Sequence, residues 1–274
     1  MNEQRAFRDS LAHRKLLLCA FKKCVADGTA VLVDKFPPSF RFTQMIAPDI
    51  VTISPGWFLM GSMQGQENEQ PCHRVWLDSF GIGRFPITNR EYKKFVEATG
   101  RQLPPFFLDP IFSNPEQPIV AVSWDDAAAY CAWLSEQNNA LFRLPSEAER
   151  ERAARGGLEG ALYPWGDEPP PPTFVGCNLG TGGPAKVGLN APNGFGLYDM
   201  SENVHEWCAD WYDYNYYSHS PDHNPRGPDF GQRRVSRGGS WRHRIQYSRC
   251  AARSSLPIAF KYADYGFRVA MTIP

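Results

Sequence analysis

The chain lacks an excess of charge of either sign, and it lacks the cysteine spacing of a metal or redox motif. Its 274 residues include 29 basic and 29 acidic side chains, so the formal net charge is zero. Proteins that neutralise several phosphates usually carry a basic excess, and we therefore expect no nucleic-acid partner. The seven cysteines form no Cys-x-x-Cys pair. An odd, unclustered set is typical of reduced thiols rather than of a disulfide framework or a thiolate zinc site.

Long hydrophobic runs are also missing. The apolar stretch at residues 16–21 is too short to cross a membrane, and no small-residue cleavage site accompanies it. We expect no membrane association and no signal peptide, and together with reduced thiols this favours a cytoplasmic location. The sequence also contains no internal repeat, no glycine-rich phosphate loop, no nucleophile elbow and no evident pair of catalytic carboxylates.

The composition that is present predicts a packed core crossed by many turns, because 42% of the residues are hydrophobic and there are 24 prolines and 23 glycines. Residues 1–48 differ from the rest and are predicted to form an N-terminal helical extension, with a basic, apolar-striped helix at 3–26. This helix could pack against the main domain or serve as a docking arm for a partner. Residues 49–274 form the main domain.

Three helices of the main domain are predicted by capping boxes, in which a hydroxyl cap is followed three residues later by an acid. The pairs are Thr88 with Glu91, Ser123 with Asp126, and Ser146 with Glu149. The spacing of the second helix, at 124–137, predicts burial of Ala128, Cys131, Ala132 and Leu134. Brief strands are expected at 57–60, 74–77, 81–83 and 267–270. The pattern indicates an α+β fold with much irregular structure.

Several ordered blocks of sequence resemble one family. They lie at residues 55–62, 85–92, 118–124, 143–149, 163–167 and 194–207, and the chain closes with Arg237-Gly-Gly-Ser-Trp and Gly266-Phe-Arg. Together they resemble the formylglycine-generating-enzyme (sulfatase-modifying factor) family over about residues 49–274. The resemblance implies a C-type-lectin-like fold of the formylglycine-generating-enzyme type, with its ligand-facing surface near the C-terminus.

The copper-binding cysteines of that family are not found here. The family's enzyme oxidises a substrate cysteine with copper held by two cysteines after the Gly-Gly-Ser element, and two thiolates suit Cu(I). The first of these positions falls on His243 and the second on Ile245. Cys250 matches a different family cysteine and is predicted to lie in the core. We therefore expect no copper and no oxidation of cysteine to formylglycine.

A histidine-metal oxidase is the alternative function, because related family members use iron and histidines for other oxidations. The ion, iron or copper, would be held near His243 or by the His219-x-x-x-His223 pair. That spacing carries little weight without a helix to align the two rings. His205 stands where the family usually has tryptophan, and we interpret it as structural.

A structural calcium ion is expected at Asp199, Glu202, Val204 and Glu206, which match a calcium loop of the family. The resemblance assigns side-chain oxygens to the first and last residues and backbone carbonyls to the middle two. Calcium prefers six to eight oxygen ligands, and the loop with water could supply them. The alternative is a tight turn whose acidic side chains face solvent.

The segment between Arg237 and Arg268 has no helical or strand period, and no asparagine follows Asn224. Family members often carry asparagines here, and their replacement within an intact frame resembles the variable proteins of diversity-generating retroelements. In those proteins, adenine-directed mutagenesis rewrites asparagine codons of a C-terminal lectin-like domain. We therefore predict a non-catalytic protein whose variable region, about 240–268, binds a protein ligand.

The predicted ligand-binding residues combine rigid aromatic side chains with directional polar ones, a mixture typical of binding surfaces. They are Trp241, Arg242, His243, Arg244, Ile245, Tyr247, Ser254, Ser255, Leu256, Ile258, Phe260, Tyr262, Ala263, Asp264 and Tyr265. Some of the aromatic residues could instead fill the core, and Trp241 and Tyr265 are the first candidates because they adjoin the frame. A purely structural domain is the remaining alternative.

Overall fold

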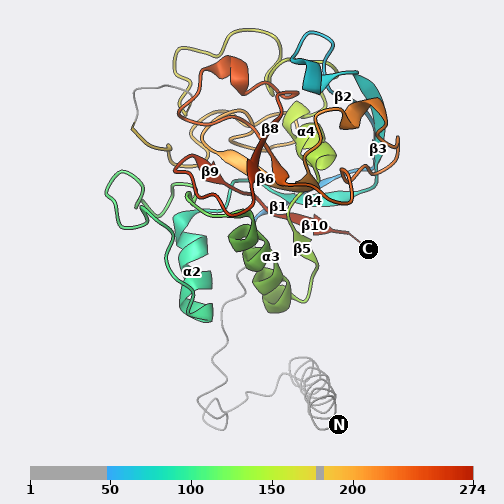
Figure 1. The fold of residues 1–274 in the computed structure, drawn as a ribbon. Helices are drawn as coiled ribbons and strands as arrows, with labels where there is room; N and C mark the ends of the chain where they lie inside the picture. The colour runs from blue at the N-terminus through green and yellow to red at the C-terminus, as the bar shows by residue number, and fades with distance from the viewer. Residues whose placement is uncertain (1–47, 177–181, 274) are drawn as a thin grey trace, which may run out of the picture. The chain divides into compact units, whose positions relative to one another are not determined.

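The computed structural model describes residues 48–176 and 182–273. The chain divides into two units, Met1–Gln44 and Met45–Pro274, and the described residues belong to the second. The helix predicted at 3–26 lies outside the described residues. The second unit has the expected mixture of short strands, three helices and long irregular connections (Figure 1).

A four-stranded antiparallel sheet joins segments from both ends of this unit. Its order is β1-β4-β10-β5, with the bounds β1 (Ile50–Ile53), β4 (Phe80–Gly83), β10 (Ala270–Thr272) and β5 (Phe142–Arg143). Ile50 pairs with Gly83, and Ala270 pairs with Ile82. Strands from opposite ends of the described unit therefore flank the same central strand, which closes the domain.

The strand predicted at 267–270 begins only at Ala270, so this prediction was wrong in its position. The carbonyls of Phe267 and Val269 still accept hydrogen bonds from Ile87 N and Gly83 N, at 2.9 and 2.8 Å. Between these two residues, the Arg268 side chain turns inward and is fully buried. The ladder therefore becomes regular only after Arg268.

All three predicted capping boxes are confirmed, with both reciprocal hydrogen bonds present in each. They begin helices α2 (Asn89–Thr99), α3 (Trp124–Asn138) and α4 (Glu147–Arg155). In Figure 1, α2 and α3 lie side by side below the first sheet. Each box satisfies backbone N–H groups that a helix start otherwise leaves without partners.

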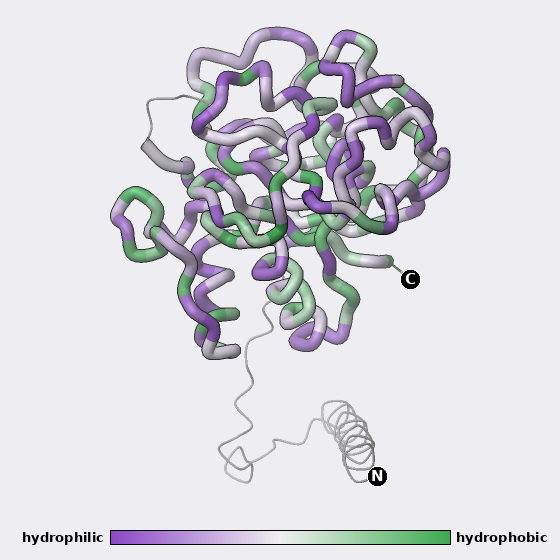
Figure 2. Tube along the Cα trace, viewed as in Figure 1, coloured by the Kyte–Doolittle hydropathy of each residue, from purple (hydrophilic) through white to green (hydrophobic). Residues whose placement is uncertain are grey.

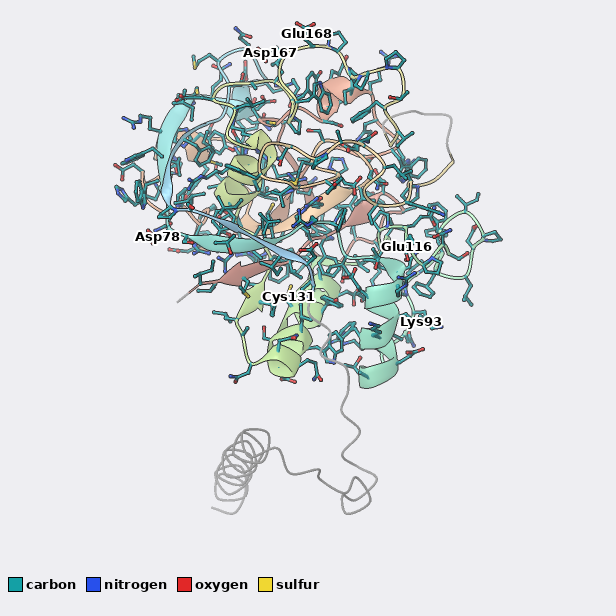
Figure 3. All side chains as sticks on the ribbon, turned by 180° about the vertical axis from the view of Figure 1, so that it is seen from behind. Asp78, Lys93, Glu116, Cys131, Asp167 and Glu168 are labelled. Carbon is teal, nitrogen blue, oxygen red and sulfur yellow. The ribbon has the colours of Figure 1, made fainter. Side chains whose placement is uncertain are left out.

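The buried face of α3 differs in part from the predicted face, because two neighbouring aromatic residues replace two alanines at the inward positions. Cys131 and Leu134 are buried as expected, but Ala128 is only partly buried and Ala132 is exposed. The rings of Tyr130 and Trp133 take the inward positions, packing 5.8 Å from Tyr92 and 5.4 Å from Phe95 on α2. Large aromatic rings bury more apolar area than alanines, so they determine which side faces inward. Figure 3 labels Cys131 on α3.

A second four-stranded sheet takes two short strands from the C-terminal segment and lies above the first sheet in Figure 1. Its order is β8-β7-β6-β9, and β6 and β9 are parallel while the other pairs are antiparallel. The bounds are β6 (His205–Trp211), β7 (Arg233–Arg237), β8 (Ser254–Pro257) and β9 (Tyr265–Gly266). Short 3-10 turns occur at η2 (Glu67–Glu69), η3 (Tyr216–Ser218) and η4 (Ile245–Tyr247).

The predicted strands at 57–60, 74–77 and 81–83 are confirmed to within one residue. They are β2 (Gly56–Met60) and β3 (His73–Leu77), which form a two-stranded sheet, and β4. Helix α4 contacts β2 and β3 of this small sheet as well as β6 and β7 of the second four-stranded sheet. Among the described residues, no helix is sufficiently long and apolar to span a bilayer.

Helix α4 is both highly charged and deeply buried: eight of its nine residues are buried, including Glu147, Arg150 and Glu151. Arg237 of β7 donates to Glu147 Oε1 at 2.9 Å and also to Glu151. Although burial pushes the pKa of Glu151 upward, the guanidinium groups of Arg155 and Arg237 outweigh it and hold the pKa below its usual value. Glu151 is therefore charged, and both carboxylates are paired with Arg237 in the interior.

A second buried cluster is centred on Glu206 of β6. Its Oε2 accepts hydrogen bonds from Arg150 Nε at 2.7 Å and Arg268 Nε at 2.6 Å, and its Oε1 accepts from Arg268 Nη2 at 2.7 Å. Burial acts to raise the pKa of Glu206, but the two arginines hold it below its usual value. Glu206 thus connects α4, β6 and the residues just before β10.

The first prediction concerns this network. Replacing Arg237 with methionine should lower the free energy of unfolding by about 3–5 kcal/mol, because buried carboxylates lose a cation. The measurement is urea denaturation. Lys93→Met is the matched control: Lys93 lies on the outer side of α2 (Figure 3), pairs with Glu97 in solvent, and should cost about 0.5 kcal/mol or less. Equal losses in the two variants would contradict the assignment.

The second prediction concerns Asp210, whose Oδ2 accepts from Glu147 N at 2.9 Å at the start of α4. Burial, reinforced by the charge of Glu147, raises the pKa of Asp210 to about 8. Between the unfolded value near 3.8 and this value, the folded chain holds a proton that the unfolded chain has lost. Stability should therefore fall as the pH rises through this window, by up to about 1.4 kcal/mol per pH unit.

Asp210→Asn keeps an acceptor for Glu147 N and removes the titration, so it should flatten this part of the pH dependence. Denaturation curves at several pH values between 5 and 8.5 measure the slope, and Asp229→Asn, at an exposed site, serves as the control. An unchanged slope in Asp210→Asn would show that Asp210 is ionised throughout.

Candidate ligand-binding surface and metal-binding residues

The turn that opens the C-terminal segment requires its two glycines. Gly238 and Gly239 have φ values of +93° and +69°, a region that favours glycine. A Cβ at Gly239 would lie 1.9 Å from Ser248 Oγ, and one at Gly238 would lie 2.8 Å from Arg150 Nη2. The Arg-Gly-Gly-Ser-Trp block is therefore a constraint on the backbone.

Four arginines, called here the anchoring arginines, fix the segment at intervals: Arg237, Arg249, Arg253 and Arg268. Beyond the contacts of Arg237 and Arg268 described above, Arg249 makes a two-bond pair with Glu69 at 2.6 and 2.7 Å. Arg253 makes the same arrangement with Glu147, at 2.7 and 2.9 Å. Such bidentate pairs fix both position and orientation, so the backbone is held before, within and at the end of the predicted variable region.

The predicted ligand-binding residues fall into three groups by exposure. Exposed side chains are those of Arg242, Arg244, Tyr247, Phe260 and Tyr262. Half-buried ones are those of His243, Ile245, Ser254, Ser255, Ile258 and Ala263. Buried ones are those of Trp241, Leu256, Asp264 and Tyr265. We call the first group the exposed set; it is the part of the prediction that presents side chains to solvent.

The four buried residues support the surface from beneath, so the prediction of ligand contact needs correction for them. Trp241 packs with Phe112, Val120 and Val204, while Leu256 and Tyr265 belong to the main core cluster. Asp264 Oδ2 accepts from Ser240 Oγ at 3.0 Å. Trp241 and Tyr265 were the first candidates for the core, whereas nothing in the sequence distinguished Leu256 or Asp264 from their exposed neighbours.

Apolar side chains of another segment lie next to this surface. Phe112 lies 6.2 Å from Trp241 and 5.6 Å from Phe106, measured between ring centroids. In the same loop after α2, Phe106, Leu108 and Ile111 are exposed, and the loop is partly green in Figure 2. This apolar loop was not identified from the sequence, because no periodic pattern marks it.

The predicted calcium residues fit an ion only in part. Both oxygens of Glu206 accept hydrogen bonds from arginines, as described above, so this side chain belongs to the arginine cluster and its assignment as a calcium ligand stays a prediction. Asp199 and Glu202 fit better, because both are buried carboxylates. Burial raises the pKa of both, and for Glu202 the charge of nearby Asp199 raises it further. A cation between two such groups would relieve their repulsion.

Glu202, which is predicted to give a backbone carbonyl to the ion, also has a buried side chain with two hydrogen bonds. Its Oε1 accepts from Asn190 Nδ2 at 3.1 Å, and its Oε2 accepts from Ser201 N at 2.9 Å. Asp199 Oδ2 accepts from Gly188 N at 2.9 Å. Both carboxylates are thus held in place in the interior, and the alternative of solvent-facing acids is wrong.

The structure brings together a group of residues that the sequence did not link. His205, His243 and Asp264 place one possible ligand atom each within 4.8 Å of one another, the only such group of three among residues 48–176 and 182–273. Burial, with His243 beside it, lowers the pKa of His205 to about 3, so its ring is neutral. His219 and His223 do not take part: His223 packs against Trp57.

His243 and Ile245, which stand at the positions of the family's two copper-binding cysteines, lie close to the start of η4. His243 belongs to the group of three, and Ile245 begins η4 with a half-buried side chain. Cys250 is buried as predicted; burial raises the pKa of its thiol to about 12, and its carbonyl accepts from Arg237 Nη2 at 2.8 Å.

Comparison with known proteins identifies the family. Residues 36–273 match the sulfatase-modifying factor enzyme 1-like domain. The chain belongs to this family. The formylglycine-generating enzyme of Thermomonospora curvata is 34% identical over 304 aligned residues, which cover 85% of this chain and 98% of that enzyme.

Other relatives are longer proteins. The serine/threonine-protein kinase pkn1 of Chlamydia pneumoniae is 34% identical over 251 residues, covering 84% of this chain. The chain spans 39% of the length of that protein and of its Chlamydia caviae counterpart.

Two solved structures share the fold. PvdO from Pseudomonas aeruginosa has a TM-score of 0.73 and 29% identity, covering 82% of this chain and 95% of that one. Treponema denticola variable protein 1 has a TM-score of 0.71 and 24% identity, covering 81% and 94%. The predicted α+β, C-type-lectin-like fold of the formylglycine-generating-enzyme type is therefore confirmed.

The third prediction separates supporting residues from exposed ones. Trp241→Ala should cost about 3–5 kcal/mol of unfolding free energy, because it removes a ring packed in the core. Tyr262→Ala, at an exposed position, should cost less than about 1 kcal/mol. Thermal and urea denaturation measure both. A loss for Tyr262→Ala as large as that for Trp241→Ala would place Tyr262 among the supporting residues.

Proposed function

We propose that the protein is a non-catalytic, cytoplasmic binding protein whose C-terminal surface recognises a protein ligand. The observation that supports this most is the separation of roles along the segment. The anchoring arginines and the four buried residues hold the backbone in place. The side chains of the exposed set between them point to solvent and do not form part of the buried core. A surface of this kind can change its side chains without changing its scaffold.

The chemistry of the exposed set suits a protein ligand. Tyr247, Phe260 and Tyr262 are each nearly half exposed, and the rings of Phe260 and Tyr262 meet edge to face at 5.8 Å. Exposed aromatic rings provide large contacts at low cost in conformational entropy, and arginines such as Arg242 and Arg244 add directional hydrogen bonds. Tyrosine and arginine are also enriched among energetically dominant interface residues.

We infer further that the exposed set is diversified as in the variable proteins of diversity-generating retroelements. Treponema denticola variable protein 1 has this fold, and the replaced asparagines of the C-terminal segment are consistent with adenine-directed change. A copy of the DNA for residues 240–268, beside a reverse-transcriptase gene and differing mainly at adenines, is the genomic observation that this proposal expects.

A display library tests the proposal. The exposed set (Arg242, Arg244, Tyr247, Phe260 and Tyr262) is randomised in the full chain, displayed on yeast and challenged with protease. Most members should remain resistant, and selection against a purified target such as lysozyme should yield specific binders. A matched library at Trp241, Leu256, Asp264 and Tyr265 should lose resistance in most members. Equal losses in the two libraries, or an exposed-set library without any binder, would contradict the proposal.

The alternative, a metal-dependent oxidase, is tested by activity. The purified chain is incubated with oxygen, a reductant and either Cu(I) or Fe(II), together with a cysteine-containing peptide, and the products are analysed by mass spectrometry. An unmodified peptide agrees with the binding proposal. Metal-dependent conversion of the cysteine, lost in His243→Ala, would replace that proposal with the enzyme.

We also propose a structural calcium ion held by Asp199 and Glu202, with the Val204 carbonyl as a further oxygen ligand. The fourth prediction follows from this proposed calcium ion. Calcium at 100 times its dissociation constant should stabilise the fold by about 2.7 kcal/mol, raising the midpoint of thermal denaturation. Glu202→Gln should abolish the increase, whereas Glu159→Gln, at an exposed site, should keep it. A midpoint insensitive to calcium in the wild type would exclude the ion.

A further inference from the structure

Three side chains with metal-binding chemistry converge beneath the exposed set. His205 is the first residue of β6, His243 lies between the Gly-Gly-Ser-Trp turn and η4, and Asp264 immediately precedes β9. The backbone brings two of them together directly, because His205 N donates to Asp264 O at 2.8 Å. His243 is positioned by the tight turn at Gly238 and Gly239, since His243 N donates to Ser240 O at 3.0 Å.

The separation of the ring nitrogens suits a shared ion. His205 Nε2 and His243 Nδ1 are 3.2 Å apart. A tetrahedral zinc ion about 2.0–2.1 Å from each of two nitrogens places them about 3.3–3.4 Å from one another. One possible ligand atom each of His205, His243 and Asp264 lies within 4.8 Å of the other two, so the three side chains are close enough to share an ion once the carboxylate moves toward the rings. A direct hydrogen bond between the two imidazole rings has the same spacing and is the competing explanation.

The surroundings hold these side chains in place and leave a polar atom available. The ring of His205 stacks on that of Tyr265 at 4.7 Å. Ser240 Oγ donates to Asp264 Oδ2, which leaves Oδ1 of this carboxylate without a hydrogen bond. Asp264 is only 4% exposed. An unpartnered carboxylate oxygen this deeply buried is uncommon in folded proteins, and it offers a ligand atom for an ion.

The guanidinium of Arg242 lies close to this group. Its Nη1 lies 3.6 Å from Asp264 Oδ1, but its side chain is 53% exposed. It therefore offsets the carboxylate charge only weakly and can move into solvent when an ion enters. Arg242 thus competes with a metal and does not complete the site.

We propose that His205, His243 and Asp264 bind a divalent ion of the borderline class, with zinc as the preferred occupant. Two imidazoles and one carboxylate form a nitrogen and oxygen donor set that suits zinc or cobalt(II), whereas calcium prefers oxygen ligands alone and Cu(I) prefers thiolates. Three protein ligands leave at least one coordination position open. His243 is half-buried, so that position faces the solvent beside the exposed set.

The site goes beyond the proposed function, because it does not depend on a diversified surface. An ion there would connect β6, β9 and the turn at residues 240–243, and would stabilise the base of the segment that carries the exposed set. Its open position would accept water or a carboxylate or imidazole of a ligand.

Cobalt(II) titration of the full chain tests the proposal, because cobalt in a four-coordinate site gives intense visible absorption. We expect one equivalent to bind, to be displaced by zinc and to be unaffected by calcium. His243→Ala and Asp264→Asn should each weaken binding by more than about 10-fold. His219→Ala and His223→Ala, at histidines elsewhere, should leave it unchanged, and Arg242→Ala should leave it unchanged or strengthen it.

Circular dichroism confirms that each variant is folded, and His243 is the more informative position because its side chain is partly exposed. Two results would overturn the proposal. One is a wild-type chain that binds no cobalt at micromolar concentration, which favours the imidazole–imidazole hydrogen bond. The other is absorption that persists in His243→Ala or that carries the charge-transfer bands of thiolate ligands, which would assign the ion to cysteines.

Discussion

The buried guanidinium–carboxylate clusters are the constraint on which the rest of this structure depends. Glu147 and Glu151 of α4 and Glu206 of β6 lie in the interior and are neutralised by arginines from distant parts of the sequence. Charges taken out of water are costly unless they are paired with good geometry. Each pair therefore fixes one element against another, and the irregular connections between them need little regular structure of their own.

The same clusters explain how a C-terminal segment with few regular elements can be well defined. The anchoring arginines belong to this segment, whereas their partners belong to η2, α4 and β6. Because the anchors fix the backbone, some side chains between them point into the core, such as those of Trp241 and Tyr265. Those of the exposed set point to solvent. The group formed by His205, His243 and Asp264 lies at the boundary between the two, which is why it combines buried ligands with access to solvent.

The sequence predicted the local features of the fold well and the long-range ones only through family resemblance. Capping boxes depend on residues three apart, so all three helices were found. The inward face of α3 was partly wrong because packing of Tyr130 and Trp133 against α2 decided it. The burial of Glu147 and Arg237 could not be predicted, since each depends on partners far away in the sequence. The link between His205 and His243 likewise spans 38 positions, and the arginine partners of Glu206 were not visible in the sequence.

The most direct test of this account is a scan of single substitutions at every position from 237 to 268, read out as protease resistance of the full chain. The account predicts that the anchoring arginines, the two glycines and the four buried residues tolerate few replacements, while the exposed set tolerates nearly all. Uniform tolerance along the segment, or strong intolerance within the exposed set, would contradict it.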